Sequence, residues 1–323
     1  MNQIIRDLPD ASVPGRGGDL PETPTAARVC RNGCTPAELR QQLQHLGSDF
    51  DKQKISNITS KYRNLPERYY EGKQEEFVGP SNFEDIVKAK AKNGVESKFW
   101  EWCSGSSTLS ARARTREISH LPPIDYRYGW NMSRPEQQKT LMSGLIAARV
   151  TTLFVAPNCA PWGSQTRSMP AETLAAKRDE ETIFLTFLCA ACFVQVLLGC
   201  NYIIENSGYS DIFEKSPLAG LRSLKFFMAL LDQCMVGGQL EGQAIRKRTH
   251  FQSFKALNRV HITCDRSHKH LNLRGCGRAA CSAQYPQEEC DRILDDCSTR
   301  FRELRKGGET ILQHYPKLAL KTS

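Results

Sequence analysis

Cys159 is the residue whose surroundings point most directly to chemistry. It lies between Pro157 and Pro161, which fix a short loop, and this loop follows the apolar run TTLFV. A cysteine that is held on a rigid loop near basic groups can be deprotonated, and the thiolate is a nucleophile. A buried structural thiol is the alternative, but a proline-flanked cysteine directly after a predicted strand favours the nucleophile.

Two acidic residues also follow apolar runs. Asp125 comes after LPPI, and Glu205 follows YII and precedes Asn206. An acid at the position of Asp125 holds ribose hydroxyls in α/β nucleotide-binding folds, and the alternative is a turn aspartate. A carboxylate at the position of Glu205 can hydrogen-bond or protonate a ring nitrogen, and the alternative is a surface glutamate before an Asn-Ser-Gly turn.

A turn of small residues follows the apolar run FWEW and opens a predicted helix. Small residues let a ligand approach the backbone closely, and the amino end of a helix offers N–H groups to that ligand. The turn lacks the GxGxxG pattern of dinucleotide sites and the GKS/T pattern of phosphate loops, which disfavours both functions. It consists of Cys103, Ser104, Gly105, Ser106 and Ser107.

A parallel sheet is expected to position these residues. Short apolar runs with strand character (98–104, 121–127, 151–157 and 201–207) alternate with helical segments, and a helix is expected around 216–234. This alternation predicts an α/β fold with a mostly parallel sheet and helices on both faces. Ligands bind beyond the carboxyl ends of the strands in such sheets, which is where the polar residues lie.

An uncharged run from Ile183 to Cys200 is just long enough to suggest a membrane span. Thr186, Gln195 and several small residues interrupt this run, and a predicted strand follows it at once. We therefore expect a helix that is buried in an α/β layer, and no membrane partner.

The composition of the 323-residue chain, with 40% hydrophobic and 24% charged residues, excludes fibrous, collagen-like and wholly disordered classes. Its 44 Lys and Arg exceed its 35 Asp and Glu, which gives a formal charge of +9 and favours a polyanionic partner such as nucleic acid. The 13 cysteines are an odd number, and the N-terminus lacks the apolar segment of a secretory signal. We expect reduced thiols and an intracellular location, nuclear or cytoplasmic.

Changes in composition divide the chain into five expected segments. The first is rich in Pro, Gly, Asp and Arg without hydrophobic periodicity, which is typical of disorder. The second is strongly polar with helical stretches. The expected segments are a disordered leader (1–35), a helical N-terminal extension (36–95), a core (96–248), a small Cys/His-rich basic lobe (249–300) and a basic tail (301–323).

Four segments taken together resemble a known enzyme family. EWCSGSSTL, APNCAPWGS, IIENS and QAIRKR resemble, in order and spacing, motifs I, IV, VI and VIII of the DNA (cytosine-5) methyltransferases. The tract from Phe99 to about Ile293 is similar to the divergent methyltransferase-like domains in polyproteins of some eukaryotic retrotransposons. The resemblance implies a Rossmann-like, S-adenosylmethionine-dependent methyltransferase sheet with helices on both faces and a small C-terminal lobe.

The resemblance also implies a mechanism on DNA. S-adenosylmethionine would lie over the 103–107 turn, with Asp125 on its ribose and Pro157 lining the same site. The target cytosine would be flipped out of the duplex, and Cys159 would add to its C6. Glu205 would hold the N3 and amino edge of the ring. Arg246 and Arg248 would lie near the base and the flanking phosphates.

The chain departs from the family pattern at several positions. The family has Pro-Pro-Cys-Gln where this chain has Asn158 and Ala160 on either side of the cysteine. The family's Phe-x-Gly-x-Gly has its second glycine at the position of Ser107. Only a short segment follows Arg248, so a large target-recognition domain does not fit there.

A Cys/His-rich segment follows the predicted core. Cys264, His268 and His270 have Cys-x3-His-x-His spacing, and Cys276, Cys281 or Cys290 would complete a tetrahedral zinc site. We take Cys290 as the fourth ligand. The alternative is a basic loop with incidental thiols. Either interpretation makes this the expected phosphate-contacting face, formed by Arg246, Lys247, Arg248, Lys255, Arg259, Arg266, Lys269, Arg274 and Arg278.

Three other functions remain open at this point. An RNA cytosine methyltransferase differs from the DNA enzyme only in its substrate. A nucleic-acid-binding module of a mobile element would keep the fold without turnover, and the altered cofactor turn favours it. A cysteine hydrolase would pair Cys159 with His250, but it leaves Glu205 and the arginines unexplained.

Overall fold

The computed structural model describes most of the chain after residue 96. The expected leader (1–35) and basic tail (301–323) lie outside the described residues, as does most of the expected helical extension (36–95). The described residues are Pro80, Phe83, 85–87, 97–148, 150–224, 226–273 and 282–297.

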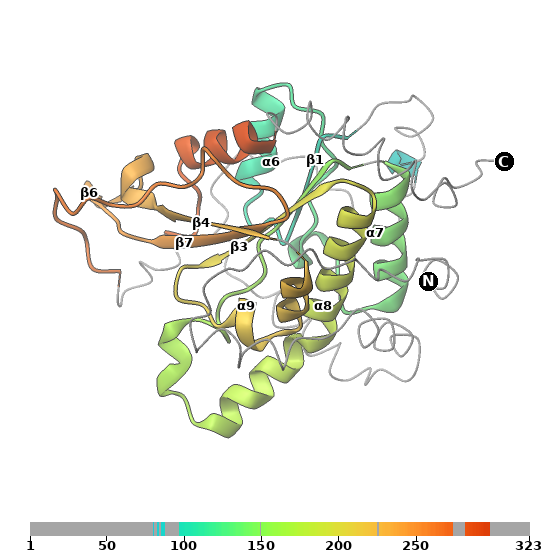
Figure 1. Ribbon diagram of the computed structural model, residues 1–323, viewed down its shortest axis with the longest axis horizontal. Helices are drawn as coiled ribbons and strands as arrows, with labels where there is room; N and C mark the ends of the chain where they lie inside the picture. Colours follow the sequence, from blue (N-terminus) through green and yellow to red (C-terminus); the bar gives the residue numbers. More distant parts are fainter. Residues whose placement is uncertain are drawn as a thin grey trace, which may run out of the picture.

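A five-stranded mixed sheet forms the centre of the molecule (Figure 1). Its first three strands are parallel to one another, and β7 is antiparallel to both of its neighbours, so β4 runs in the same direction as the first three. This arrangement confirms the predicted α/β class. In spatial order the strands are β1 (Phe99–Trp102), β2 (Thr152–Val155), β3 (Asn201–Ser207), β7 (Arg248–Ser253) and β4 (Phe227–Asp232).

Single bridges extend the sheet at both edges. Trp102 pairs in parallel with Ile124, so the LPPI run lies beside β1. Leu231 pairs in parallel with Ile262 beside β4. Strand character at LPPI was predicted, whereas the segment around Ile262 carries no strand signal of its own.

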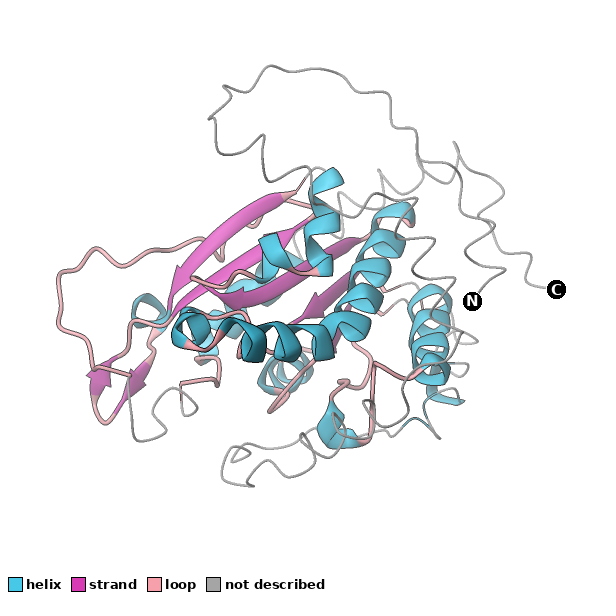
Figure 2. Ribbon diagram, turned by 90° about the horizontal axis from the view of Figure 1, so that it is seen from below, coloured by secondary structure: helices cyan, strands magenta, loops and turns pink. Residues whose placement is uncertain are grey.

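Helices cover both faces of the sheet (Figures 1 and 2), as predicted. Side chains alternate along a strand, so Trp100 joins an apolar cluster with α7 and α8 on one face while Phe99 joins a second cluster with α6 on the other. The helices are α6 (Thr108–Thr115), α7 (Pro135–Ala147), α8 (Ala171–Leu197), the short α9 (Ile212–Lys215) and a helix over 287–297. Short 3-10 helices are η3 (Tyr126–Tyr128), η4 (Ser164–Ser168), η5 (Pro217–Ser223) and η6 (Gln233–Val236), and β5 (Gln239–Leu240) pairs with β6 (Gln243–Ala244).

The run Ile183 to Cys200 largely forms the second half of α8, which packs against β2 and β3 as expected. Its central residues, such as Leu185 and Leu188, are buried in the apolar cluster. In the part of the chain that the structure describes, no helix is long and apolar enough to cross a membrane.

The prediction of a helix around 216–234 is wrong. The segment forms η5 and then strand β4, which pairs with β7 along its whole length. An apolar run without clear periodicity fits either a strand or a buried helix, and here the pairing partner decides. Met228 is 58% exposed while Ala229 is buried, because successive side chains of the edge strand β4 point to opposite faces of the sheet.

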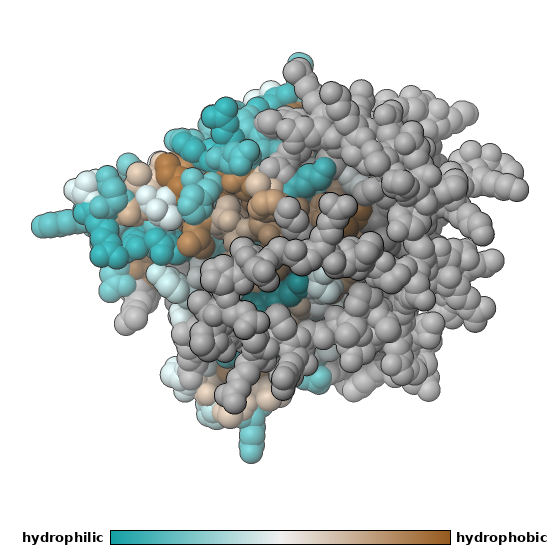
Figure 3. Space-filling view, viewed as in Figure 1, coloured by the Kyte–Doolittle hydropathy of each residue, from teal (hydrophilic) through white to brown (hydrophobic). Residues whose placement is uncertain are grey.

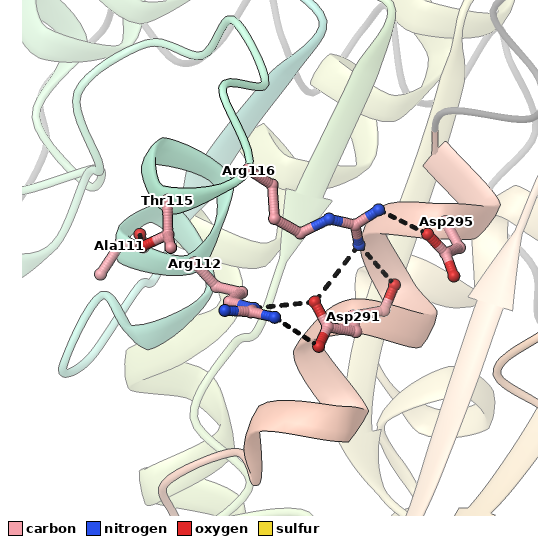
Figure 4. A network of polar contacts seen from close by, with 6 residues as sticks. All are labelled: Ala111, Arg112, Thr115, Arg116, Asp291 and Asp295. Atoms are coloured by element: carbon pink, nitrogen blue, oxygen red, sulfur yellow. Dashed lines mark hydrogen bonds and ion pairs between the residues drawn. The ribbon is translucent and has the colours of Figure 1, made fainter.

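The structure also differs from the expected lobe at 249–300. Residues 249–253 belong to β7 inside the sheet, and the helix over 287–297 packs on α6. Arg112 forms two 2.8 Å hydrogen bonds with Asp291 (Figure 4). Arg116 contacts Asp291 and also donates to Asp295 at 2.6 Å. These ion pairs join the C-terminal helix to the main fold.

One part of the N-terminal extension also packs on this fold. The Phe83 ring is buried and stacks on Trp100, with 5.2 Å between the ring centroids. It meets Trp130 edge-on at 5.1 Å. The described part of the extension therefore contributes to the apolar layer on the α7 face.

Candidate active site

Cys159 lies on a loop that leaves the carboxyl end of β2, and its side chain is exposed. The Asn206 side-chain amide donates to the Pro157 carbonyl at 2.9 Å, which attaches the loop to β3. The Cys159 carbonyl accepts hydrogen bonds from Trp162 N at 3.0 Å and Gly163 N at 2.8 Å. These bonds close a tight turn directly behind the thiol.

A second set of contacts holds the far side of this loop. Arg178 of α8 donates to the Pro161 carbonyl at 2.9 Å, and its guanidinium lies 4.7 Å from the centre of the Trp162 ring. Arg178 also pairs with Asp211 at 3.2 Å, and Asp211 N donates to the Trp162 carbonyl at 2.8 Å. The loop is therefore fixed by three elements as well as by its prolines.

Glu205 and Lys247 lie within electrostatic range of the Cys159 thiol. Although Cys159 is accessible at the surface, the surrounding protein partly desolvates its sulfur, which raises the pKa of the thiol; the Glu205 charge raises this pKa further, whereas Lys247 lowers it. Burial also raises the pKa of Glu205, against the opposing effects of Lys247 and of a hydrogen bond with Tyr285. A thiol, a carboxyl group and a cation thus gather at the ends of neighbouring strands.

Lys247 is a site residue that the sequence interpretation placed only among phosphate contacts. Glu205 faces Phe251 in the β3–β7 register, whereas Arg248 faces Asp232 in the β4–β7 register. Side chains alternate along a strand, so Lys247 lies on the face of Glu205 and Arg248 on the other face. The register of β7 could have identified Lys247, but the sequence pattern does not give that register.

Arg246 and Arg248 lie together against Asp232. The Arg248 guanidinium bonds both Asp232 carboxylate oxygens, at 2.8 and 2.6 Å, and Arg246 approaches to 3.8 Å. Burial alone would raise the pKa of Asp232, but hydrogen bonds from Arg248 and the Cys264 N–H bring it below its ordinary value. The structure therefore gives both arginines an ion-pair partner, and their contact with a base stays a prediction.

The small-residue turn lies beside Asp125, as expected. Gly105 N donates to the Asp125 carboxylate at 3.0 Å, and the Tyr128 hydroxyl donates to the Gly105 carbonyl at 2.9 Å. A side-chain carbon at Gly105 would meet no heavy atom of the described residues within 4 Å, so space is open above the turn. Ala156 N also donates to Trp102 O at 3.2 Å, which connects this turn to the start of the Cys159 loop.

Two residues of the turn hold a strained backbone. Cys103 and Ser107 have φ of 56° and 55°, a left-handed conformation that costs a residue other than glycine roughly 1–2 kcal/mol. The hydroxyl of Ser107 bonds the Ser104 hydroxyl and the Tyr128 hydroxyl, both at 3.1 Å. Ser106 bonds Thr108 at 2.8 Å at the start of α6. Side-chain hydrogen bonds thus hold the turn in this conformation.

His250 does not support the hydrolase alternative. It lies opposite Asn206 in the β3–β7 register, so it projects from the face that does not carry Glu205. Its ring packs on Phe213 with 4.5 Å between centroids, and burial lowers its pKa. A Cys–His hydrolase needs the ring nitrogen within hydrogen-bond reach of the thiol.

Three of the four predicted metal ligands come together. Cys264, His268 and His270 form a cluster whose fourth member is Cys234 of η6. Cys290 does not join it, because its side chain is fully buried in the apolar cluster beneath the 287–297 helix. Cys276 and Cys281, with Arg274 and Arg278, lie outside the described residues.

Comparison with known proteins adds no family to these observations. No protein-family model matches the chain, and no curated protein matches it significantly. The functional assignment therefore depends on the residues of this chain and their geometry.

Proposed function

We propose that this protein is an S-adenosylmethionine-dependent methyltransferase that methylates C5 of a cytosine flipped out of DNA. The observation that carries the proposal is the gathering of Cys159, Glu205 and Lys247 at the ends of adjacent strands. The open turn beside Asp125 lies at the same edge of the sheet. Cysteine hydrolysis and simple nucleotide binding each account for only part of this set.

The strand arrangement supports the fold part of the proposal. One antiparallel strand, β7, lies between two strands that run in the common direction, and the LPPI segment lies on the outer side of β1. A mostly parallel sheet with helices on both faces is what the proposed Rossmann-like methyltransferase fold requires. It brings the ends of β1, β2 and β3 to one edge, where ligands bind in such folds.

The residues of the turn fit the cofactor. Asp125 is directed at the turn and has the acidic chemistry that ribose hydroxyls require, while the space above Gly105 admits a ligand close to the backbone. Pro157 lies at the start of the neighbouring loop. S-adenosylmethionine bound there would supply an electrophilic methyl group.

The Cys159 thiolate forms a bond to C6 of the cytosine, which moves electron density to C5 and N3 of the ring. Glu205 provides the acid at N3, and its raised pKa favours the protonated carboxyl that this role needs. Methyl transfer to C5 would leave S-adenosylhomocysteine, and the C5 proton would then pass to a water molecule. The C6–sulfur bond breaks in the same elimination, which regenerates the free enzyme.

Lys247 stabilises the attacking thiolate in this scheme. Its charge lowers the pKa of Cys159 against the opposing effects of burial and of Glu205. Arg246 and Arg248 support the site indirectly by fixing the chain on either side of Lys247 to Asp232. The overall charge of +9 suits a polyanionic substrate.

The test is transfer of a labelled methyl group from S-adenosylmethionine to unmethylated duplex DNA. Cys159→Ser should lose transfer by on the order of 10³-fold or more, because the covalent step needs the thiolate. Cys200→Ser is the matched control, since Cys200 precedes β3 at the opposite end from Glu205. Its activity should match that of the wild type.

A 5-fluorocytosine oligonucleotide should trap the wild-type chain covalently and fail to trap Cys159→Ser. Transfer to structured RNA instead of DNA would change the substrate and keep the mechanism. Cofactor binding without transfer to either nucleic acid, in a folded wild-type chain, would overturn the enzyme proposal. That outcome would favour a nucleic-acid-binding module without turnover. The strained turn at Ser107 is the feature that agrees with this alternative.

A further inference from the structure

Two segments that are distant in the chain bring four metal-ligating side chains together at the edge of the sheet. Cys234 lies in η6, immediately after β4, while Cys264, His268 and His270 lie on the loop after the edge bridge at Ile262. One ligand atom from each of the four residues lies within 4.8 Å of all the others.

The distances match a tetrahedral zinc site. The Cys264 Sγ lies 3.9 Å from Nε2 of His268 and 3.4 Å from Nε2 of His270. Zinc bonds of about 2.3 Å to sulfur and about 2.0–2.1 Å to nitrogen give a sulfur–nitrogen separation of about 3.6 Å in a tetrahedron. The side chains already stand at the separation that one ion would impose.

The backbone around Cys264 also has the form of a metal-binding loop. Arg266 N donates to the Cys264 sulfur at 3.2 Å, and Arg266 has a φ of 66°, which curves the chain around the thiol. Ser267 Oγ lies 3.4 Å from Nδ1 of His268, while the other ring nitrogen of His268 lies toward the Cys264 sulfur. Contacts of this kind to ligand atoms orient metal ligands in proteins.

We propose that Cys234, Cys264, His268 and His270 bind one zinc ion as a closed Cys2His2 structural site. Two thiolates balance the charge of Zn²⁺, and four protein ligands leave no open position for catalysis. The proposal does not depend on the methyl-transfer assignment, because none of these side chains belongs to the Cys159 site.

The position of the cluster suggests what the ion would stabilise. The Cys264 N–H donates to the buried Asp232 carboxylate at 2.8 Å, and Leu271 N donates to Ala244 O of β6 at 2.8 Å. Zinc would therefore hold the 264–273 loop against the hairpin of β5 and β6, which leads directly to Lys247. Hydrophilic side chains cover the end of the molecule where β6 lies (Figures 1 and 3).

The test uses the full chain, purified under reducing conditions and reconstituted with Co²⁺ as a spectroscopic probe. We expect one tightly bound cobalt per chain, with tetrahedral d–d bands and thiolate-to-cobalt charge transfer. Added Zn²⁺ should displace the bound cobalt. A separate elemental analysis of the untreated protein should give one zinc per chain.

Variants then identify the ligands. Cys234→Ser should lose tight metal binding, whereas Cys290→Ala should keep it, with circular dichroism checking that each variant is folded. Cys234→His retains four ligands and one thiolate, so its charge-transfer intensity should fall to roughly half. Because this variant should still bind metal, the test does not require the protein to fold without a metal ion.

Several results would overturn the proposal. They are a wild-type chain without charge-transfer bands, charge transfer that is unchanged in Cys234→His, and loss of metal in Cys290→Ala alone.

Discussion

The loops that carry Cys159 and Cys264 both present a thiol next to the sheet, but their neighbours differ in kind. Cys159 has a cation and a buried carboxyl within electrostatic range, and its loop is fixed through backbone carbonyls. Cys264 has another thiol and two imidazoles directed at it. On our proposals, these neighbouring groups are what suit one cysteine to nucleophilic attack and the other to metal binding.

The strongest test of this comparison is the Asp232→Asn variant. Asp232 is fully buried and accepts from Arg248 and the Cys264 N–H, so the variant leaves the partly exposed Arg248 guanidinium without its counter-charge. We expect the free energy of unfolding in urea to fall by about 2–4 kcal/mol, because two hydrogen bonds to a charged group are weakened and the arginine keeps access to water. Metal affinity should fall with it.

Glu288→Gln is the control for that change. Glu288 pairs with Arg292 one helical turn away at 2.8 Å, and the Glu288 side chain is 53% exposed. An exposed pair of this kind contributes about 0.3–0.5 kcal/mol, so unfolding should barely shift. Equal effects of the two variants would contradict a central role for Asp232.

Arg178→Met tests the Cys159 side of the comparison. The change removes the hydrogen bond to Pro161 O, the contact with the Trp162 ring and the pair with Asp211. We expect a loss of about 1–3 kcal/mol in urea unfolding, with unchanged metal content. Lys177→Met, at the exposed neighbouring position, should stay within about 0.5 kcal/mol of the wild type.

Lys247→Met should have the smallest effect. It tests whether Lys247 is the cation that acts on the Cys159 thiol. Lys247 lowers the pKa of Cys159, so its removal raises that pKa and reduces the thiolate fraction at pH 8. We expect alkylation of Cys159 by iodoacetamide to slow about three- to tenfold, since one pKa unit is tenfold in thiolate. The rate follows from mass spectrometry of the Cys159 peptide.

Two further variants serve as comparisons for the alkylation rate of Lys247→Met. Arg246→Met should leave the alkylation rate near the wild-type value, because Arg246 lies toward Asp232. Glu205→Gln should accelerate alkylation, since the Glu205 charge raises the pKa of Cys159. A slower rate in Arg246→Met than in Lys247→Met would reverse our placement of the cation.

Much of the candidate site could be predicted because it depends on parallel strands. Polar residues that follow adjacent parallel strands meet at one edge, and this rule brought Asp125 to the 103–107 turn and Glu205 near Cys159. The burial of α8 followed from an apolar run that is interrupted by polar residues and followed by a strand.

The missed residues depend on antiparallel and edge pairing. Lys247 faces the site because of the register of β7, and a shift of one residue would have placed Arg246 and Arg248 there instead. Cys234 was missed because its segment was predicted as a helix. Only strand β4 and the bridge between Leu231 and Ile262 bring Cys234 to Cys264.

The sequence by itself determined the α/β class, the strands that are followed by the polar residues of the candidate site, and three of the four residues of the Cys/His cluster. The tertiary structure decided which cation faces Cys159, which thiol completes the Cys/His cluster, and that β7 and the 287–297 helix belong to the main fold. The physical reason is that apolar patterns and turn residues act locally. Strand order and register depend on hydrogen bonds between segments that are distant in the chain.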